Sequence, residues 1–138
     1  MKFTESRAGK LVFARLFEDE ELLDTITRAA KKANVSAGFF FLIGTLKKAE
    51  MGFYRERKYE TIEMNQPLEI VSLTGWIATR DDGEIEVHAH LSASTVVEEE
   101  VTTLGGHLTS GVITSVKVVV VIGVMEESNI SAGLDPRT

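Results

Sequence analysis

The chain has 138 residues, 43% of them hydrophobic, with a formal net charge of −6 and no cysteine. This composition excludes a disordered chain, a disulfide framework and any zinc site built from thiolates. The acidic balance makes direct DNA binding doubtful, because DNA binders gain most of their affinity from lysine and arginine that face phosphates.

The first part of the chain predicts a strand followed by the main helix. Residues 10–17 mix alternation with apolar runs, which is typical of a strand. In residues 19–33 the apolar side chains recur at helical spacing and form one face. Acids crowd the first turn of this segment and Lys31 and Lys32 close its last turn, an order that suits the helix dipole. Asn34 is the expected terminator.

The rest of the chain predicts strands, since β-branched and aromatic residues dominate it. With the one helix, these strands give an α+β fold, mostly antiparallel sheet packed with one main helix. The expected strands are residues 37–55 as one long strand or two, then 59–64, 68–80, 84–94 and 112–125.

Glycines and turn residues mark the expected breaks between these strands. Gly44 and Gly52 indicate bends or bulges. Asp82 and Gly83 predict the tight turn of a hairpin between residues 68–80 and 84–94. Residues 94–104 fit either a short helix or another hairpin arm.

We expect a single domain over residues 1–138, with a polar, loosely held tail at 129–138. The N-terminus does not have the pattern of a signal peptide, because charged residues interrupt it. The longest apolar runs, "GFFFLIG" and "VVVVIGV", are far shorter than a membrane span, so no membrane partner is expected. A cytoplasmic location is the corresponding expectation.

The candidate site is the stretch "VHAHLSAS" with the later "LGGHLTS", which together hold all three histidines of the chain. On a strand, residues two apart point to the same face, so His88 and His90 would form a two-point clamp for a metal ion. Imidazole suits zinc and neighbouring transition metals. Gly105 and Gly106 would help a loop bring His107 over the clamp. Three histidines without a fourth protein ligand leave an open position for water or a small ligand. The alternative is two ordinary polar residues on a surface strand.

Nearby polar residues are candidates for supporting roles. Glu86, Ser92 and Ser94 are candidates to bind the far ring nitrogens of the histidines. Glu86 is also the candidate general base if the metal centre is catalytic. No nucleophile motif accompanies the many hydroxyl groups.

Two aromatic stretches have simpler interpretations. In "FFF" Phe39 and Phe41 share one face and Phe40 takes the other, which is typical of a core or a subunit interface. "YRERKY", residues 54–59, is the densest basic cluster, and we interpret it as a solvated hairpin edge whose charges block aggregation.

The chain resembles the PPC ("plants and prokaryotes conserved") domain family. The resemblance covers nearly the whole chain and rests on "FFLIGTLKKAEMGFY", "PLEIVSLTGWI", "HAHLSAS" and "GGHL". It implies an α+β subunit that assembles as a homotrimer. It also implies a bound metal, zinc first of all, near the subunit boundary, with His88, His90 and His107 as its ligands. The chain has no AT-hook, and it differs from many relatives at Lys117, a strand position that is often acidic.

Three functions follow as hypotheses. The first is a metal-binding trimeric protein without established catalysis. The second is a zinc-dependent hydrolase or lyase that uses the open metal position. The third is a DNA-binding or transcription-associated protein, which the family label suggests and the acidic charge disfavours.

Overall fold

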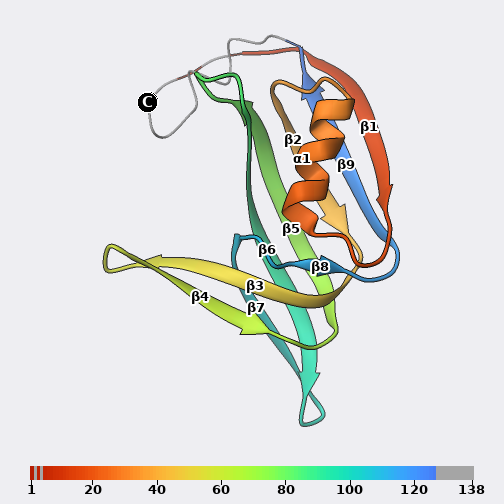
Figure 1. Ribbon diagram of the computed structural model, residues 1–138, viewed down its shortest axis with the longest axis vertical. Coiled ribbons are helices and arrows are strands. Elements are labelled where there is room, and N and C mark those ends of the chain that lie inside the picture. Colours follow the sequence, from red (N-terminus) through yellow and green to blue (C-terminus); the bar gives the residue numbers. More distant parts are fainter. Residues whose placement is uncertain (2, 4, 127–138) are drawn as a thin grey trace.

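The computed structural model describes residues 1, 3 and 5–126. In this part of the chain a single helix packs against an antiparallel sheet, as expected. Figure 1 shows how the elements are arranged. In chain order they are β1 (Ala8–Leu16), α1 (Leu22–Lys32), β2 (Gly38–Ile43), β3 (Thr45–Arg55), β4 (Lys58–Met64), β5 (Leu68–Thr79), β6 (Ile85–Val97), β7 (Glu100–Leu108), β8 (Ile113–Thr114) and β9 (Val118–Met125).

The helix α1 begins at Leu22 rather than at Asp19. Asp19 has a φ of 65°, outside the helical region, and its backbone N–H donates to the carbonyl of Thr114 at 3.0 Å. Glu21 is the N-cap, and its carboxylate accepts hydrogen bonds from two backbone N–H groups of the first turn. The attachment of this segment to β8 therefore delays the start of the helix, which the apolar spacing alone does not reveal.

The end of α1 confirms Asn34 as its terminator. Asn34 has a φ of 55°, and its N–H donates to the carbonyl of Lys31 at 3.2 Å. The next N–H, of Val35, donates to the carbonyl of Ala30 at 2.9 Å. This is the Schellman arrangement, in which a left-handed residue closes the last turn and asparagine can stand in for glycine.

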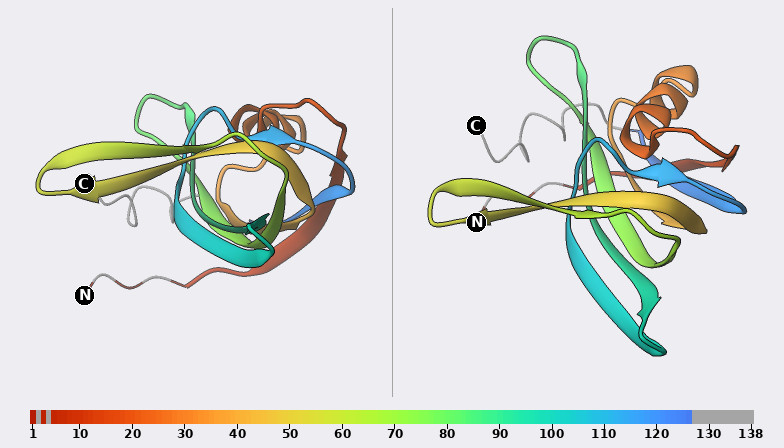
Figure 2. Two further views of the ribbon diagram at one scale, coloured as in Figure 1. Left: turned by 90° about the horizontal axis from the view of Figure 1, so that it is seen from below. Right: turned by 60° about the horizontal axis from the view of Figure 1, so that its bottom comes forward.

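The sheet curls on itself because β3 pairs with β5 at its start and with β7 further along. The strand order is β1-β9-β2-β5-β6-β7-β3-β4, and β3 also pairs with β5. The pairs β5–β6, β6–β7, β7–β3 and β3–β5 thus form a closed circuit, and every pair in the sheet is antiparallel. Figure 2 shows the curled sheet from below, with the β3–β4 hairpin projecting away from it.

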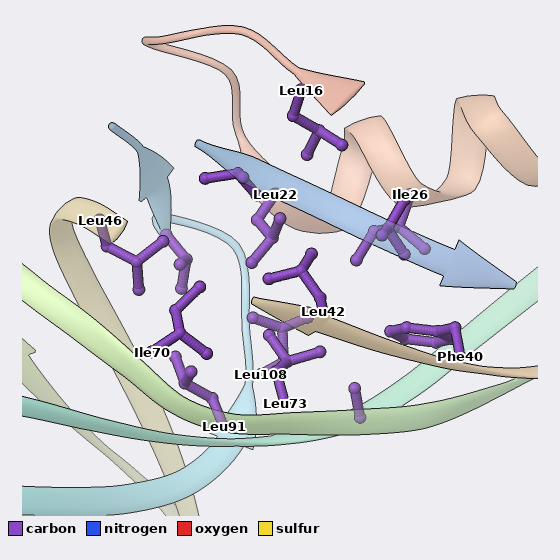
Figure 3. Packing of buried hydrophobic residues seen from close by; sticks show 14 of the residues in the cluster. Leu16, Leu22, Ile26, Phe40, Leu42, Leu46, Ile70, Leu73, Leu91 and Leu108 are labelled. Carbon is purple, nitrogen blue, oxygen red and sulfur yellow. The ribbon is translucent and has the colours of Figure 1, made fainter. Parts of the chain in front are cut away.

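The core lies between α1 and one face of this sheet, which we call the inner face. Strand residues alternate between the two faces, so Phe40 is only 2% exposed whereas Phe39 and Phe41 are each 48% exposed on the opposite, outer face. Figure 3 shows the packing of the inner side chains. Those with the largest buried volumes are Phe40, Leu22, Ile26, Leu42, Leu46, Met51, Leu73, Ile77, Leu91 and Ile122.

Residues 37–55 form two strands that are divided at Gly44, which has a φ of +141°. A side chain at Gly44 would also meet the backbone of Val118. Gly52, in contrast, is not a bulge, because the register of β3 with β4 runs unbroken from Ala49 to Arg55. A side chain at Gly52 would displace the ring of Tyr59.

The segment 94–104 is a hairpin and not a helix. β6 continues to Val97, the chain reverses at Glu98 and Glu99, and β7 begins at Glu100. Glu98 and Glu99 have φ values of 50° and 66°. Two-residue hairpin loops of type I′ need positive φ at both positions and favour asparagine and glycine there. Because both positions hold glutamate, this turn could not be predicted from its residues.

Residues 112–125 do not form one strand. β8 ends at Thr114 and β9 begins at Val118, with Lys117 between them at a φ of 57°. Lys117 is thus in a connection and not in the strand position that was expected. β9 then runs between β1 and β2. The tail at 129–138 lies outside the described residues.

Candidate metal centre

His88 and His90 lie on the outer face of β6, side by side as expected for residues two apart on a strand. Their ring centroids are 5.5 Å apart. The β5–β6 hairpin turns around Asp82 and Gly83, as predicted, and sets Trp76 opposite His88. The clamp is therefore built on a strand that is held in a hairpin, rather than on a loop.

His107 reaches the clamp from the neighbouring strand β7, where it is the cross-strand partner of His90. The ring centroids of His107 lie 4.5 Å from His90 and 5.2 Å from His88. The expectation that a loop brings His107 over the clamp was wrong, because Gly105 and Gly106 are both within β7.

The glycine before His107 is needed because β7 passes close to β3. A Cβ at Gly106 would lie 2.9 Å from the carbonyl oxygen of Gly52 and 3.0 Å from the ring of Phe53. Gly52 is in turn the cross-strand partner of His107. These close approaches let β3 and β7 pair beside the histidines.

The three imidazoles form a compact donor group: one nitrogen from each of His88, His90 and His107 lies within 4.8 Å of the other two. A tetrahedral zinc site with Zn–N bonds of about 2.0–2.1 Å needs nitrogens roughly 3.3 Å apart. Small side-chain rotations would close that difference. The donor set therefore fits a transition-metal ion.

Burial and charge favour the neutral, ligating form of His107. Partial burial lowers the pKa of His107 from its ordinary value, and the positive charges that His90 and His88 acquire on protonation lower this pKa further. A neutral imidazole carries the free lone pair that a metal ion needs.

Two aromatic side chains flank the histidines on the outer face. The ring of Trp76 stacks on His88, with centroids 5.1 Å apart and an interplanar angle of 27°. The ring of Tyr59, on β4, lies 5.8 Å from His107. Sequence reasoning missed both. Trp76 could have been found, because it and His88 are equally far in sequence from Asp82. Tyr59 comes beside His107 only through the pairing of β3 with both β4 and β7.

The residues proposed for supporting roles do not join the donor group. Glu86 lies two residues before His88 on β6, and the compact group consists of the histidines without its carboxylate. The hydroxyl of Ser94 forms a hydrogen bond with that of Thr103 at 2.6 Å, so it is engaged across the ladder. Ser92 is the cross-strand partner of Gly105 in the ladder between β6 and β7.

A hollow of about 300 Å³ opens beside two of the histidines. It lies where the pairing between β3 and β7 ends. The residues that line it are Gly52, Phe53, Tyr54, His90, Gly106 and His107.

Comparison with known proteins supports the resemblance found in the sequence. Residues 3–126 match the family model of the Plants and Prokaryotes Conserved (PCC) domain. Among curated protein sequences, none matches the chain. Within the described residues, no helix has the length and apolar character needed to cross a membrane.

Solved structures share the fold over most of the chain. A plant- and prokaryote-conserved (PPC) protein of Pyrococcus horikoshii is 30% identical with a TM-score of 0.80, covering 92% of this chain and 86% of that one. A metal-containing protein of Archaeoglobus fulgidus is 26% identical, also with a TM-score of 0.80, covering 93% and 88%. A candidate DNA-binding protein of Bacteroides thetaiotaomicron is 19% identical with a TM-score of 0.77, covering 94% of each chain, and shows the fold alone.

Proposed function

The chain belongs to the Plants and Prokaryotes Conserved (PCC) domain family, and we propose that it is a metal-binding subunit of an oligomer. In this proposal His88, His90 and His107 hold one transition-metal ion, with zinc as the first choice of metal. The observation that carries the proposal is the convergence of all three histidines of the chain, from two strands, on one point of the outer face.

The chemistry of the donors supports zinc or a neighbouring metal. Imidazole nitrogens suit zinc, copper, iron and nickel, whereas magnesium and calcium prefer oxygen ligands. Three protein ligands leave a position open for water or a small ligand. The similar protein of Archaeoglobus fulgidus is described as metal-containing, which favours the same property here.

An apolar patch on the outer face supports assembly into an oligomer, for which the family resemblance implies a homotrimer. Phe41 pairs across the sheet with Val121, which pairs with Phe13 on its other side, so their side chains share one face. Exposed apolar areas that extend over several strands are typical of subunit interfaces. The large exposed side chains of this patch on β1 and β2 are Leu11, Phe13, Phe39, Phe41 and Ile43.

A zinc-dependent hydrolase or lyase is a second candidate, favoured by the hollow beside His90 and His107. A metal ion with an open position lowers the pKa of bound water to about 7. Glu86 stays the candidate general base. A His88→Ala variant that retained any activity found would exclude this mechanism.

Direct DNA binding is the third candidate, and the distribution of charge weighs against it. The basic side chains of "YRERKY" are at the tip of the β3–β4 hairpin, beside Glu56 and Glu60. Its signature would be affinity for duplex DNA that falls steeply with salt. Absence of any binding at low salt would reject it.

The decisive experiment is metal analysis by elemental mass spectrometry, on protein made without a histidine tag. We expect about one zinc or similar ion per chain. His107→Ala should lose the metal because two imidazoles form a much weaker site. Thr74→Ala is the matched control, since Thr74 pairs with His90 and is exposed on the same face. Full metal content in His107→Ala would reject the three-histidine site.

A further inference from the structure

We infer that the hollow between β3 and β7 binds a small organic carboxylate, whose oxygen would take the open position of the metal centre and whose apolar part would lie against Phe53 and Tyr54. This inference rests on the proposed metal site. It adds to that site a ligand class and the residues that select it.

The hollow is a fork between two strands. The ladder between β3 and β7 comprises only the pairs Met51↔Leu108 and Gly52↔His107. Beyond Gly52 the β3–β4 hairpin turns away from β7, as Figures 1 and 2 show. The fork therefore opens directly beside the histidine pair, and its volume of about 300 Å³ is at the lower end for small-molecule sites.

The donor set determines the sign of the ligand charge. His88, His90 and His107 are all neutral when they ligate, so none of them offsets the charge of a divalent ion. An anion at the open position is therefore favoured over a neutral or cationic ligand.

The walls of the hollow favour a carboxylate over a phosphate. None of the six residues that line the hollow is lysine or arginine, and phosphate sites commonly rely on such side chains or on a helix N-terminus. A divalent ion with three neutral ligands attracts either anion, so the preference rests on the rest of the ligand. Phe53 and Tyr54 add aromatic surface, which an inorganic anion cannot use and an apolar substituent can.

The depth of the hollow depends on Gly106. The nearest atoms to a Cβ at this position would be the Gly52 carbonyl oxygen at 2.9 Å and the Phe53 ring at 3.0 Å, and both residues line the hollow. Gly105 offers a matched comparison on the same strand. Its Cβ would lie 3.2 Å from the carbonyl oxygen of Leu91, and Gly105 is not among the lining residues.

The test uses the full chain loaded with Co²⁺, whose visible absorption reports the ligands of the metal. Benzoate and acetate are the carboxylate probes, and inorganic phosphate is the competing anion. We expect both carboxylates to change the cobalt spectrum at millimolar concentration, and benzoate to bind more tightly than either acetate or phosphate.

Two pairs of variants locate the binding. Gly106→Ala should bind cobalt but weaken benzoate binding by roughly tenfold or more, whereas Gly105→Ala should match the unmodified chain. Tyr54→Ala should weaken benzoate by about threefold to tenfold and leave acetate unchanged, the size expected for loss of one aromatic contact. Tyr54→Phe should retain both affinities. The exposed Tyr54 pair decides the matter if Gly106→Ala fails to fold.

The outcomes separate this inference from the metal site itself. Cobalt binding with no response to either carboxylate overturns the inference and leaves the metal site standing. A response to phosphate alone overturns the choice of carboxylate. Equal benzoate affinity in Tyr54→Ala and Tyr54→Phe removes the assigned location. Failure to bind cobalt at all overturns both proposals.

Discussion

The two faces of β2 carry phenylalanine side chains in different environments. Phe40 is packed in the core at 2% exposure, while its neighbours Phe39 and Phe41 are each 48% exposed on the outer face. The outer row continues across the sheet from Phe39 through Trp76 to His88. The inner face thus accounts for the fold, and the outer face carries the apolar patch and the candidate metal centre.

The two faces differ so clearly because successive residues of each strand point to opposite sides of the sheet. Along β6, His88 and His90 point outward, whereas Ala89 and Leu91, each one residue after a histidine, are buried. A shift of the β6 register by one residue would exchange the two sets and bury the imidazoles. The buried residues therefore hold the histidines on the outer face.

Truncation of Phe40 is the largest expected effect. Phe40→Ala removes a fully buried ring and should lower the free energy of unfolding by about 3–5 kcal/mol, through lost burial and the cavity that remains. Phe39→Ala, on the other face of the same strand, should lower it by no more than roughly 1 kcal/mol. Chemical denaturation of both variants, at the same protein concentration, checks the contrast. Equal losses would mean that the outer face is packed as tightly as the core.

Metal binding should stabilise the fold from the outer face, with the next largest effect. A ligand that binds only the folded state adds about 2.7 kcal/mol at a free concentration of 100 times its Kd. We expect Zn²⁺ to raise the melting temperature and a chelator to reverse the rise. The same addition to His107→Ala is the control and should give little change. Identical melting of the unmodified chain with and without chelator would contradict the site.

The sequence predicted those parts of this arrangement that depend on local periodicity. The alternation in "FFF" and "HAH" fixes which side chains share a face, and Asp82-Gly83 fixes the β5–β6 register. The helix face and its Asn34 terminator follow from similar local patterns.

The rest depends on contacts between distant strands. Tyr59 comes beside His107 because β3 pairs with β4 on one edge and with β7 on the other, and no local pattern encodes that pairing. The turn at Glu98 and Glu99 uses residues that rarely take positive φ, so its composition gives no signal. The glycines at the site were expected to serve a loop, whereas they lie within β7, where Gly106 lets the backbone of β3 pass close by.

Loss of the Trp76 ring should weaken metal binding moderately. Trp76 stacks on His88 and holds one face of its ring, so it acts as a positioning residue. Trp76→Ala should reduce metal affinity by about threefold to tenfold, the range expected for one aromatic contact, and Trp76→Phe should restore most of it. Competition with a chromophoric chelator measures both variants. Because Trp76 is the sole tryptophan, quenching of its fluorescence by Ni²⁺ offers a direct readout in the unmodified chain. No quenching would place the metal elsewhere.

The smallest effect concerns pH and the metal-free protein. The pKa of His107 is lowered in the folded state, by burial first and then by the charges of His90 and His88. As pH falls through the ordinary histidine range, the unfolded chain gains a proton at this residue that the folded chain does not, so stability declines. The decline ends once pH is below the folded pKa. Denaturation curves between about pH 5 and about pH 8 should show this slope, and His107→Gln should reduce it. In the metal-loaded protein the slope should be steeper, because protons compete with the metal for all three imidazoles. A steeper slope without metal than with it would contradict a site made from these histidines.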